Sequence, residues 1–431
     1  MSASQTGIDA TADAPLMSAR RVSLLGGLLI AMGPISMAMY TPAMPAIVEA
    51  FGSTEAAVKL TLTLYFAGFA CAQLIAGPLS DALGRKPVTV AFLLIYLLGS
   101  VLALLAPTVE TLMLGRFVQG VGASVGIAVS RALVRDLFTG HTSAKIMNVI
   151  GIILALGPAL APTIGGVLME FYGWRSSFVA MFLVGVGSIA AVSVFMRETV
   201  GRDLSRLQPA SLLRSYGLLL TNRHFLLTVT VISGAVGALY AQSTFLPFIL
   251  MNRVGLTPSQ FGLGMLMQSG CFFLGALMAR QLMRRISAYQ LVTPGLCLIA
   301  LGSAGVFMLN FWAPTYLRVM GPVAPYALGI AFVMPAMSTA ALAPFRENAG
   351  AASALMGFLQ MGSGLLFGTI GALMGDPVSA MANLVPVMGL AACLAYIVYR
   401  RHPHLAEEEP RHDVLAAAPP GRTLMPDKEN P

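Results

Sequence analysis

Arg116 is the residue of this sequence whose type and setting are hardest to explain by packing alone. It lies with Gln119 inside the apolar run 111–133, and their three-residue spacing places both side chains on one face of a helix. A lone charge in apolar surroundings costs several kcal/mol unless it is paired or hydrated. Two interpretations stay open: Arg116 lines a cavity, where it contacts a ligand or takes part in ion coupling, or it bonds Gln119 and backbone carbonyls and holds helices together.

The acids and histidines that usually form enzyme and metal sites lie outside the interiors of the apolar runs. The 18 Asp and Glu fall in loops, tails or helix ends, and the five His fall in polar stretches. The four cysteines (Cys71, Cys271, Cys297 and Cys393) are too widely spaced for a disulfide or metal pattern. An intramembrane active site would need a buried acid, histidine or metal cluster. We therefore expect no catalytic residue, no cofactor and no metal site.

Composition explains why so few residues can do chemistry. Of the 431 residues 57% are hydrophobic and only 10% charged, whereas about 25% of a soluble domain is charged. So few charges could not cover the surface of a soluble body of this size, so the chain is expected to be embedded in a lipid bilayer. The basic residues behind the net charge of +8 sit at the ends of apolar runs and form no stripe, which predicts no nucleic-acid partner.

Apolar runs long enough to cross a membrane as helices, about 20 residues each, occur along most of the chain. We expect an all-α membrane protein with twelve transmembrane helices, at residues 22–46, 57–76, 87–107, 111–133, 146–169, 176–195, 224–250, 260–281, 289–311, 318–343, 351–373 and 379–399. The polar stretch 196–223 divides them six and six, which suggests two parallel pseudo-repeats. The expected organisation is a tail at 1–21, six-helix bundles at 22–195 and 224–399 joined by the linker 196–223, and a disordered tail at 400–431.

Basic residues also predict the orientation, because loops rich in Lys and Arg stay in the cytoplasm. With the N-terminus inside, most of the 26 Lys and Arg fall in inside segments. Both termini are therefore expected to be cytoplasmic.

A polar loop after the second expected helix reads Gly77-Pro-Leu-Ser-Asp81-Ala-Leu-Gly84-Arg85-Lys86. We expect Gly77 to let a neighbouring backbone approach closely, as small residues do in lipid-embedded helices. Arg85 and Lys86 are expected either to bind anionic headgroups or only to set the topology.

Asp81 lies at a helix end near the membrane surface, where a charge needs a partner. Arg131 and Arg135 lie at the same depth, and the start of the eleventh helix near Gly350 is an alternative. We expect Asp81 to form a latch with one of them that closes the cytoplasmic side.

Three segments resemble motifs of the major facilitator superfamily. The polar loop from Gly77 to Lys86 resembles its signature loop, Arg116-Phe-Val-Gln119-Gly120-Val-Gly122 its fourth-helix motif, and Gly157-Pro158-Ala-Leu-Ala-Pro162-Thr-Ile-Gly165-Gly166 the fifth-helix motif of its drug antiporters. The segments Tyr40-Thr-Pro42-Ala-Met-Pro45, Arg131-Ala-Leu-Val-Arg135-Asp136 and 349–360 are similar to the bicyclomycin/chloramphenicol-resistance drug efflux subfamily. The fifth-helix residues suit a kinked helix at the interface between the halves or plain helix packing.

The resemblance implies an exporter of a small organic, drug-like molecule that works by alternating access and exchanges protons. It would be a monomer in the bacterial inner membrane, with the lipid bilayer, a small-molecule substrate and protons as its partners. Expected substrate-binding residues are Arg116 and the polar or aromatic residues Tyr40, Gln119, Tyr240, Gln242 and Gln360.

One position departs from the subfamily pattern. Relatives usually carry an Asp two residues before the first-helix Tyr, where this chain has Ala38. The alternative function is therefore export or exchange of an anionic metabolite or metal-chelating natural product without the usual acid-based proton coupling, with Arg116 and Lys59 as candidate ligands. The default expectation for Lys59 is that it extends to the membrane–water interface.

Overall fold

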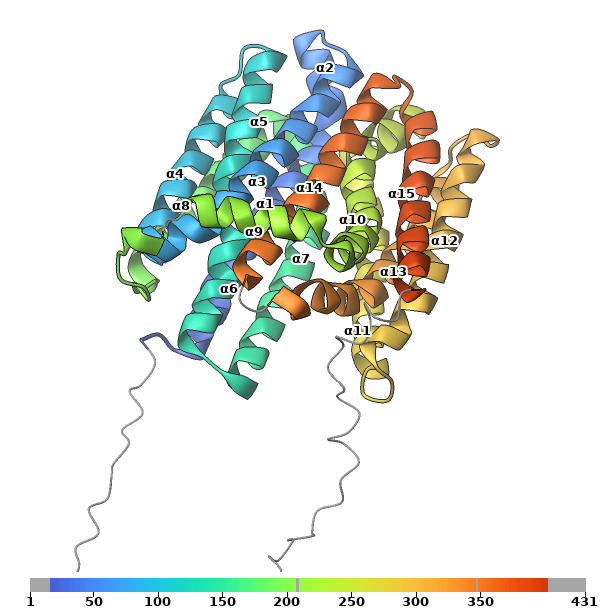
Figure 1. The fold of residues 1–431 in the computed structure, drawn as a ribbon. Helices are drawn as coiled ribbons and strands as arrows, with labels where there is room; N and C mark the ends of the chain where they lie inside the picture. Colours follow the sequence, from blue (N-terminus) through green and yellow to red (C-terminus); the bar gives the residue numbers. More distant parts are fainter. Residues whose placement is uncertain (1–15, 207–208, 346–347, 402–431) are drawn as a thin grey trace, which may run out of the picture.

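The computed structural model describes residues 16–206, 209–345 and 348–401, apart from the side chains of Ala144, Ala155, Pro158 and Arg206. Within that part every regular element is a helix (Figure 1). Twelve helical segments are long and apolar enough to cross a membrane, so the expectation of an all-α protein with twelve spans is confirmed. The expected tails lie mostly outside the described residues.

The first six spans contain eight helices. Two spans are interrupted: α1 and α2 are joined by a 3-10 turn at Thr41–Ala43, and α5 and α6 meet at Ser124. The helices are α1 (Ala19–Tyr40), α2 (Met44–Phe51), α3 (Glu55–Leu83), α4 (Arg85–Leu104), α5 (Val109–Ala123), α6 (Val125–Leu137), α7 (Gly140–Tyr172) and α8 (Arg175–Phe195).

The second six spans follow a short additional helix. Residues 196–223, expected as a linker, include α9 (Pro209–Thr221). The remaining helices are α10 (Arg223–Ser243), α11 (Pro258–Leu282), α12 (Val292–Phe307), α13 (Tyr316–Leu342), α14 (Ala349–Leu373) and α15 (Pro377–Arg400), with a π-helical turn at Phe248–Arg253.

The two halves meet along two helix pairs. α3 packs against α14, and α7 packs against α11. Because α3 and α11 are the second spans of their halves and α7 and α14 the fifth, each contact joins a second span to a fifth. Two equivalent contacts of this kind are expected if the halves are pseudo-repeats of one another. Buried apolar side chains form two large clusters, one mainly in each half.

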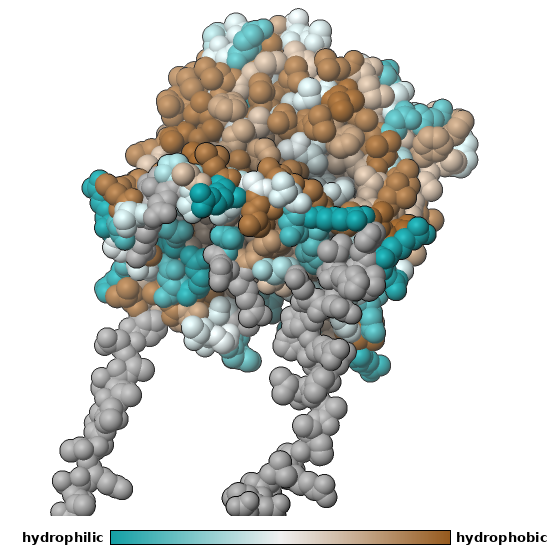
Figure 2. Space-filling model, in the orientation of Figure 1, coloured by the Kyte–Doolittle hydropathy of each residue, from teal (hydrophilic) through white to brown (hydrophobic). Residues whose placement is uncertain are grey.

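The bundle has two polar ends. We call the end where α1 begins and α15 ends the terminal face, and the opposite end, where α2 ends and α3 begins, the distal face (Figure 1). Figure 2 shows apolar side chains over the flank of the bundle and polar side chains gathered toward the terminal face. Leu94, Leu98 and Leu160 are among the large apolar residues that the membrane-spanning helices expose. A flank of this kind is stable against lipid and not against water.

α9 connects the halves near the terminal face. The hydroxyl of Tyr216 donates to the carbonyl of Leu74 on α3 at 2.7 Å, and the hydroxyl of Ser215 donates to Asn348, directly before α14, at 3.2 Å. Burial raises the pKa of Tyr216 to about 12, so its hydroxyl keeps the proton that it donates. The linker helix is therefore fixed to both sides of the α3–α14 contact.

Glycines let α3 and α5 cross in close contact. A Cβ atom at Gly120 would lie 2.2 Å from the carbonyl oxygen of Tyr65, and one at Gly68 would lie 2.1 Å from that of Phe117. Because these neighbours are backbone atoms, a methyl group could fit only if the helices moved apart. Close backbone approach is how helices gain packing energy in lipid, where the hydrophobic effect does not drive them together.

Gly120→Ala should therefore destabilise the protein by about 1–3 kcal/mol, the usual cost of overpacking. Gly151→Ala is the matched control, because a Cβ there meets no atom within 4 Å and alanine favours a helix over glycine by about 1 kcal/mol. Thermal unfolding in detergent would compare the two variants. A melting temperature for Gly120→Ala at or above that of the unmodified protein would contradict the close contact of α3 and α5.

Candidate functional site

The guanidinium of Arg116 lies inside the first half, away from solvent. The residue is 0% exposed. Its Nη1 donates to the side-chain oxygen of Gln119 and lies 3.9 Å from the sulfur of Met181. The guanidinium carbon lies 4.5 Å from the ring centroid of Tyr40 and 4.3 Å from that of Tyr65. Arg116 is thus held by one amide and two aromatic faces. Among the described residues no Asp or Glu forms an ion pair with it.

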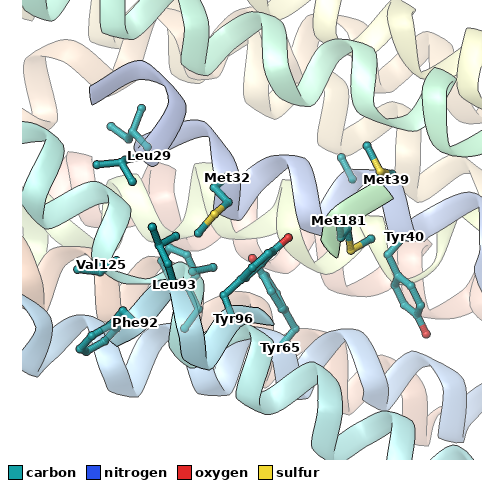
Figure 3. Close-up of a cluster of buried hydrophobic side chains, with 14 of the residues drawn as sticks. Leu29, Met32, Met39, Tyr40, Tyr65, Phe92, Leu93, Tyr96, Val125 and Met181 are labelled. Carbon is teal, nitrogen blue, oxygen red and sulfur yellow. The ribbon is translucent and has the colours of Figure 1, made fainter. Parts of the chain in front are cut away.

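The polar groups around Arg116 are themselves bonded. The amide nitrogen of Gln119 donates to Ser100 at 2.8 Å. The hydroxyl of Tyr40 bonds Thr61 at 2.5 Å, and the hydroxyl of Tyr65 donates to the carbonyl of Gly33 at 2.8 Å. Figure 3 shows Tyr40, Tyr65, Tyr96 and Met181 within one buried cluster of the first half. We call Arg116, Gln119, Tyr40, Tyr65 and Met181 the arginine cluster.

The structure brings some of the expected substrate-binding residues together and separates others. Tyr40, Arg116 and Gln119 meet in the arginine cluster. Tyr240 belongs to the second half, where its ring centroid lies 5.7 Å from that of Phe66 on α3. This ring pair crosses the interface one residue from Tyr65.

The other two expected residues lie apart from the arginine cluster. The amide of Gln242 donates to Gln268 at 3.0 Å, which joins α10 to α11 within the second half. Gln360, on α14, is partly exposed.

At the distal face, α3 reaches across to the second half. Lys59 Nζ donates to Glu55 and to the carbonyl of Gly375, both at 3.3 Å, and lies 5.0 Å from the ring centroid of Phe248. Asn252 donates to Glu55 at 3.3 Å. We call Glu55, Lys59, Asn252 and Gly375 the distal latch.

The expectation that Lys59 extends to the membrane–water interface is wrong. The residue is 0% exposed, because the second half covers it. The depth of Lys59 in its helix suggested a route to water, but the sequence contained no sign that the α14–α15 loop would lie over it.

A second ion pair lies beside the distal latch, between Arg253 and Asp376 at 3.4 Å. Burial raises the pKa of Asp376, but the Ser379 N–H and hydroxyl and then the charges of Arg253 and Lys59 outweigh it, so its pKa lies below the usual range. The folded state therefore binds this proton less readily than the unfolded chain, and the stabilisation from Asp376 is lost as the pH falls through the lowered pKa.

The fifth-helix motif packs on two neighbours. Ideal Cβ atoms at Gly157 and Gly165 would lie 2.9 Å from Ile35 and 2.3 Å from the Met39 carbonyl, both of α1, and one at Gly166 would lie 2.2 Å from the Pro258 carbonyl of α11. Pro162 meets α11 through its carbonyl, opposite Gly262. The side chain of Pro158 lies outside the described residues.

Further hydrogen bonds join α7 to α11. Thr163 donates to the carbonyl of Gly262 at 3.0 Å, and the N–H of Ser259 donates to Glu170 at 3.1 Å. These bonds lie in the distal halves of both helices.

At the terminal face, Arg85 is the centre of a charge network within the first half. Its guanidinium bonds Asp81, Ser80 at 2.7 Å and Asp136 at 3.1 Å, and the residue is 2% exposed. The expectation that Arg85 contacts headgroups or only sets topology is therefore wrong. Arg85 is buried, and its charge is paired with the carboxylates of Asp81 and Asp136.

The expected loop from Gly77 to Lys86 is wrong as a loop, because α3 continues to Leu83 and α4 begins at Arg85. Three other residues of this signature segment have specific places. Lys86 donates to the Ser193 carbonyl at 2.8 Å. Gly84 has a φ of 101°, a conformation that a residue with a side chain rarely adopts. A Cβ at Gly77 would meet no atom within 4 Å, so the expected close backbone approach at Gly77 is wrong.

Asp81 lies 3.8 Å from Arg135, within the salt-bridge reach that the sequence predicted. The pair connects α3 to α6, and both helices belong to the first half. Arg131 instead donates to Ser353 on α14 at 2.7 Å. The terminal-face bond between the halves is therefore made by Arg131 and not by Asp81.

Sequence reasoning missed Glu198, the third acid at this face. Its carboxylate accepts from the backbone N–H groups of Arg85 at 2.8 Å and Lys86 at 3.0 Å. An acid at the N-terminus of a helix is stabilised by the free N–H groups and the helix dipole. The available signal was an acid shortly after a membrane span, but nothing in the sequence indicated which helix it would cap.

Asp136→Asn should destabilise the protein more than Asp81→Asn. The side chain of Asp136 is only 14% exposed, so loss of its bond to buried Arg85 should cost about 1.5–3 kcal/mol. The side chain of Asp81 is 43% exposed, where an ion pair contributes about 0–1 kcal/mol. Thermal unfolding of both variants measures the difference, and the reverse order would contradict this ranking.

Comparison with known proteins gives the fold and the family. Over residues 26–369 the sequence matches the Major Facilitator Superfamily. It is 30% identical over 386 residues to the Multidrug resistance protein MdtL of Salmonella paratyphi A, covering 86% of this chain and 92% of that protein. It is 27% identical over 398 residues to the Uncharacterized MFS-type transporter YdgK of Bacillus subtilis, covering 88% and 94%.

A solved structure has the same fold. The human organic anion transporter MFSD10 (TETRAN) matches 88% of this chain and 99% of its own at a TM-score of 0.60 and 18% identity. At that identity the likeness concerns the fold alone. The family match over most of the chain, together with twelve membrane-spanning helices, places this chain in the Major Facilitator Superfamily of transporters.

Proposed function

We propose that the protein exports a small organic molecule from the cytoplasm by alternating access between its two halves. The observation that carries the proposal is the way the halves meet, because both interfaces join a second span to a fifth span. Such an interface lets each half move as one body around a site between them. The similarity to a multidrug resistance protein supports a drug-like substrate and the outward direction.

The contacts between the halves are those of an inward-facing carrier if the terminal face lies in the cytoplasm, as the basic residues indicate. At the distal face the halves are joined by the distal latch and by the α7–α11 bonds. At the terminal face the helices of the two halves are bonded through Arg131 and Ser353, so more of these bonds join the halves at the distal face. In this conformation substrate would enter from the cytoplasm, and the distal bonds would have to break for its release.

The second part of the proposal is that no internal carboxylate couples transport to protons. Among the described residues no Asp or Glu is buried; the buried basic groups are Lys59, Arg85, Arg116 and His224. His224, which the sequence placed in a polar stretch, is bonded to the Ala340 carbonyl at 2.8 Å near the terminal face. Transport would then be facilitated, an exchange of anions, or coupled through a titrating group of the substrate.

Lys59→Met should shift the carrier toward the conformation that is open at the distal face. The variant loses the Lys59 bond to the Gly375 carbonyl, which joins the halves, whereas the Lys59–Glu55 bond lies within α3 and favours neither conformation. One hydrogen bond of a charged group is worth about 1.5–3 kcal/mol, so the equilibrium should move by about tenfold or more. Double electron–electron resonance between spin labels at Ser53 and Ala313, in a cysteine-free background, measures the populations that are closed and open at the distal face. Arg318→Met is the control, because that arginine also lies at the distal face but bonds Ala313 within its own half. Unchanged label distances in Lys59→Met would contradict the latch.

A pH gradient alone should not drive a non-titratable compound uphill. Ethidium, or another permanently charged compound first shown to move downhill through the protein, is followed in inverted vesicles with the membrane potential held at zero. The unmodified protein should equalise its concentration and not accumulate it. Ala38→Asp, which places a carboxylate two residues before Tyr40, should gain accumulation. Uphill movement by the unmodified protein would show that a group of the protein itself carries the proton.

A further inference from the structure

Arg116 has an unused binding edge. Its Nε and Nη2 are buried and have no hydrogen-bond partner, whereas Nη1 is bonded to Gln119. In a guanidinium, Nε–H and one N–H of Nη2 point the same way along one edge, at the spacing of the two oxygens of a carboxylate. The free donors are therefore the pair that binds a carboxylate through two parallel hydrogen bonds.

The neighbouring side chains do not fill this edge. The side-chain oxygen of Gln119 is taken by Nη1. The hydroxyls of Tyr40, Tyr65 and Tyr96 are bonded to Thr61, to the Gly33 carbonyl and to Ser36. The cluster thus holds the guanidinium through its other nitrogen and its faces. A buried charge with an empty donor pair is costly, and a ligand that brings a negative charge would relieve that cost.

One aromatic ring separates the arginine cluster from the interface of the halves. The ring of Tyr65 contacts that of Phe66 at 6.2 Å between centroids, and Phe66 contacts Tyr240 of the second half. Tyr40 is the last residue of α1, directly before the 3-10 turn at Thr41–Ala43.

We propose that the transported molecule is an organic anion, whose carboxylate binds the Nε and Nη2 edge of Arg116 after the ring of Tyr40 or Tyr65 moves away. This inference rests on the proposed transport function and names its substrate class. The two tyrosine rings provide a surface for an aromatic or apolar body attached to the carboxylate. An inorganic anion has the same charge but would not use that surface.

The test uses the full chain in nanodiscs with Trp312→Phe as the background, so that Trp174 is the only tryptophan. Trp174 contacts Phe178 at 6.0 Å between ring centroids, and Phe178 contacts Tyr40 at 5.6 Å. Its fluorescence should therefore respond when the arginine cluster rearranges. The probes are benzoate and naphthoate, each compared with its neutral amide, and chloride and phosphate.

The expected result is saturable binding of at least one carboxylate, with no binding of its amide and no competition by chloride or phosphate. Arg116→Gln should weaken that binding by at least about tenfold, and Arg116→Lys should also weaken it because a lysine lacks the planar fork. Arg318→Gln, an exposed arginine of the second half, should bind as the background does. Equal binding of acid and amide, no binding of either acid, or binding of inorganic anions only would overturn the proposal.

A second measurement covers the case in which Arg116→Gln does not fold. The infrared carboxylate bands of isotope-labelled naphthoate should shift when it binds the unmodified protein, because two charge-assisted hydrogen bonds change the carboxylate stretch. Unshifted bands on binding would overturn the proposal.

Counterflow of radiolabelled benzoate or naphthoate in proteoliposomes separates this inference from the proposed function. Ethidium transport without carboxylate binding would leave the transporter standing and remove the organic-anion site. Carboxylate binding without transport of any compound would support the organic-anion site and contradict the proposed transport function.

Discussion

A cation that leaves water must be compensated by the protein around it, and three cations of this chain meet that requirement in different ways. Arg85 has two carboxylates. Lys59 has one carboxylate and a carbonyl of the other half. Arg116 has an amide, two aromatic faces and an empty donor edge. Compensation is most complete at the terminal face and least complete in the core of the first half.

Two of these solutions suit mechanical roles in the proposed movement of the halves. The charge network of Arg85 lies within one half, so it can stay intact while the halves move. The distal latch crosses between the halves, and its bond from Lys59 goes to a neutral carbonyl and not to an acid of the partner half. Breaking a hydrogen bond between a charged and a neutral group costs little enough free energy for the halves to separate. Breaking a fully desolvated ion pair across the interface would cost much more.

Glycines that let helix backbones pack closely also stabilise the bundle. Gly68 and Gly120 bring α3 against α5 inside the first half, and Gly166 and Gly262 bring α7 against α11 between the halves. In lipid such contacts depend on shape and not on burial from water. The fifth-helix motif therefore belongs both to the stability of the first half, through α1, and to the distal closure, through α11.

The sequence by itself determined the class of the protein, because the number and length of the apolar runs leave only a bundle of twelve spanning helices. It also singled out Arg116, and it limited the partners of Asp81 to Arg131, Arg135 or the helix start near Gly350, because a charge near lipid needs a partner and only certain residues lie at its depth.

Only the tertiary structure decided which partners were taken. The acid that caps α4 is Glu198, the cover over Lys59 is the α14–α15 loop, and the terminal-face bond between the halves comes from Arg131. The sequence could not predict these choices, because depth in the membrane follows from position along a helix, whereas the neighbours at that depth depend on how the helices rotate and pack.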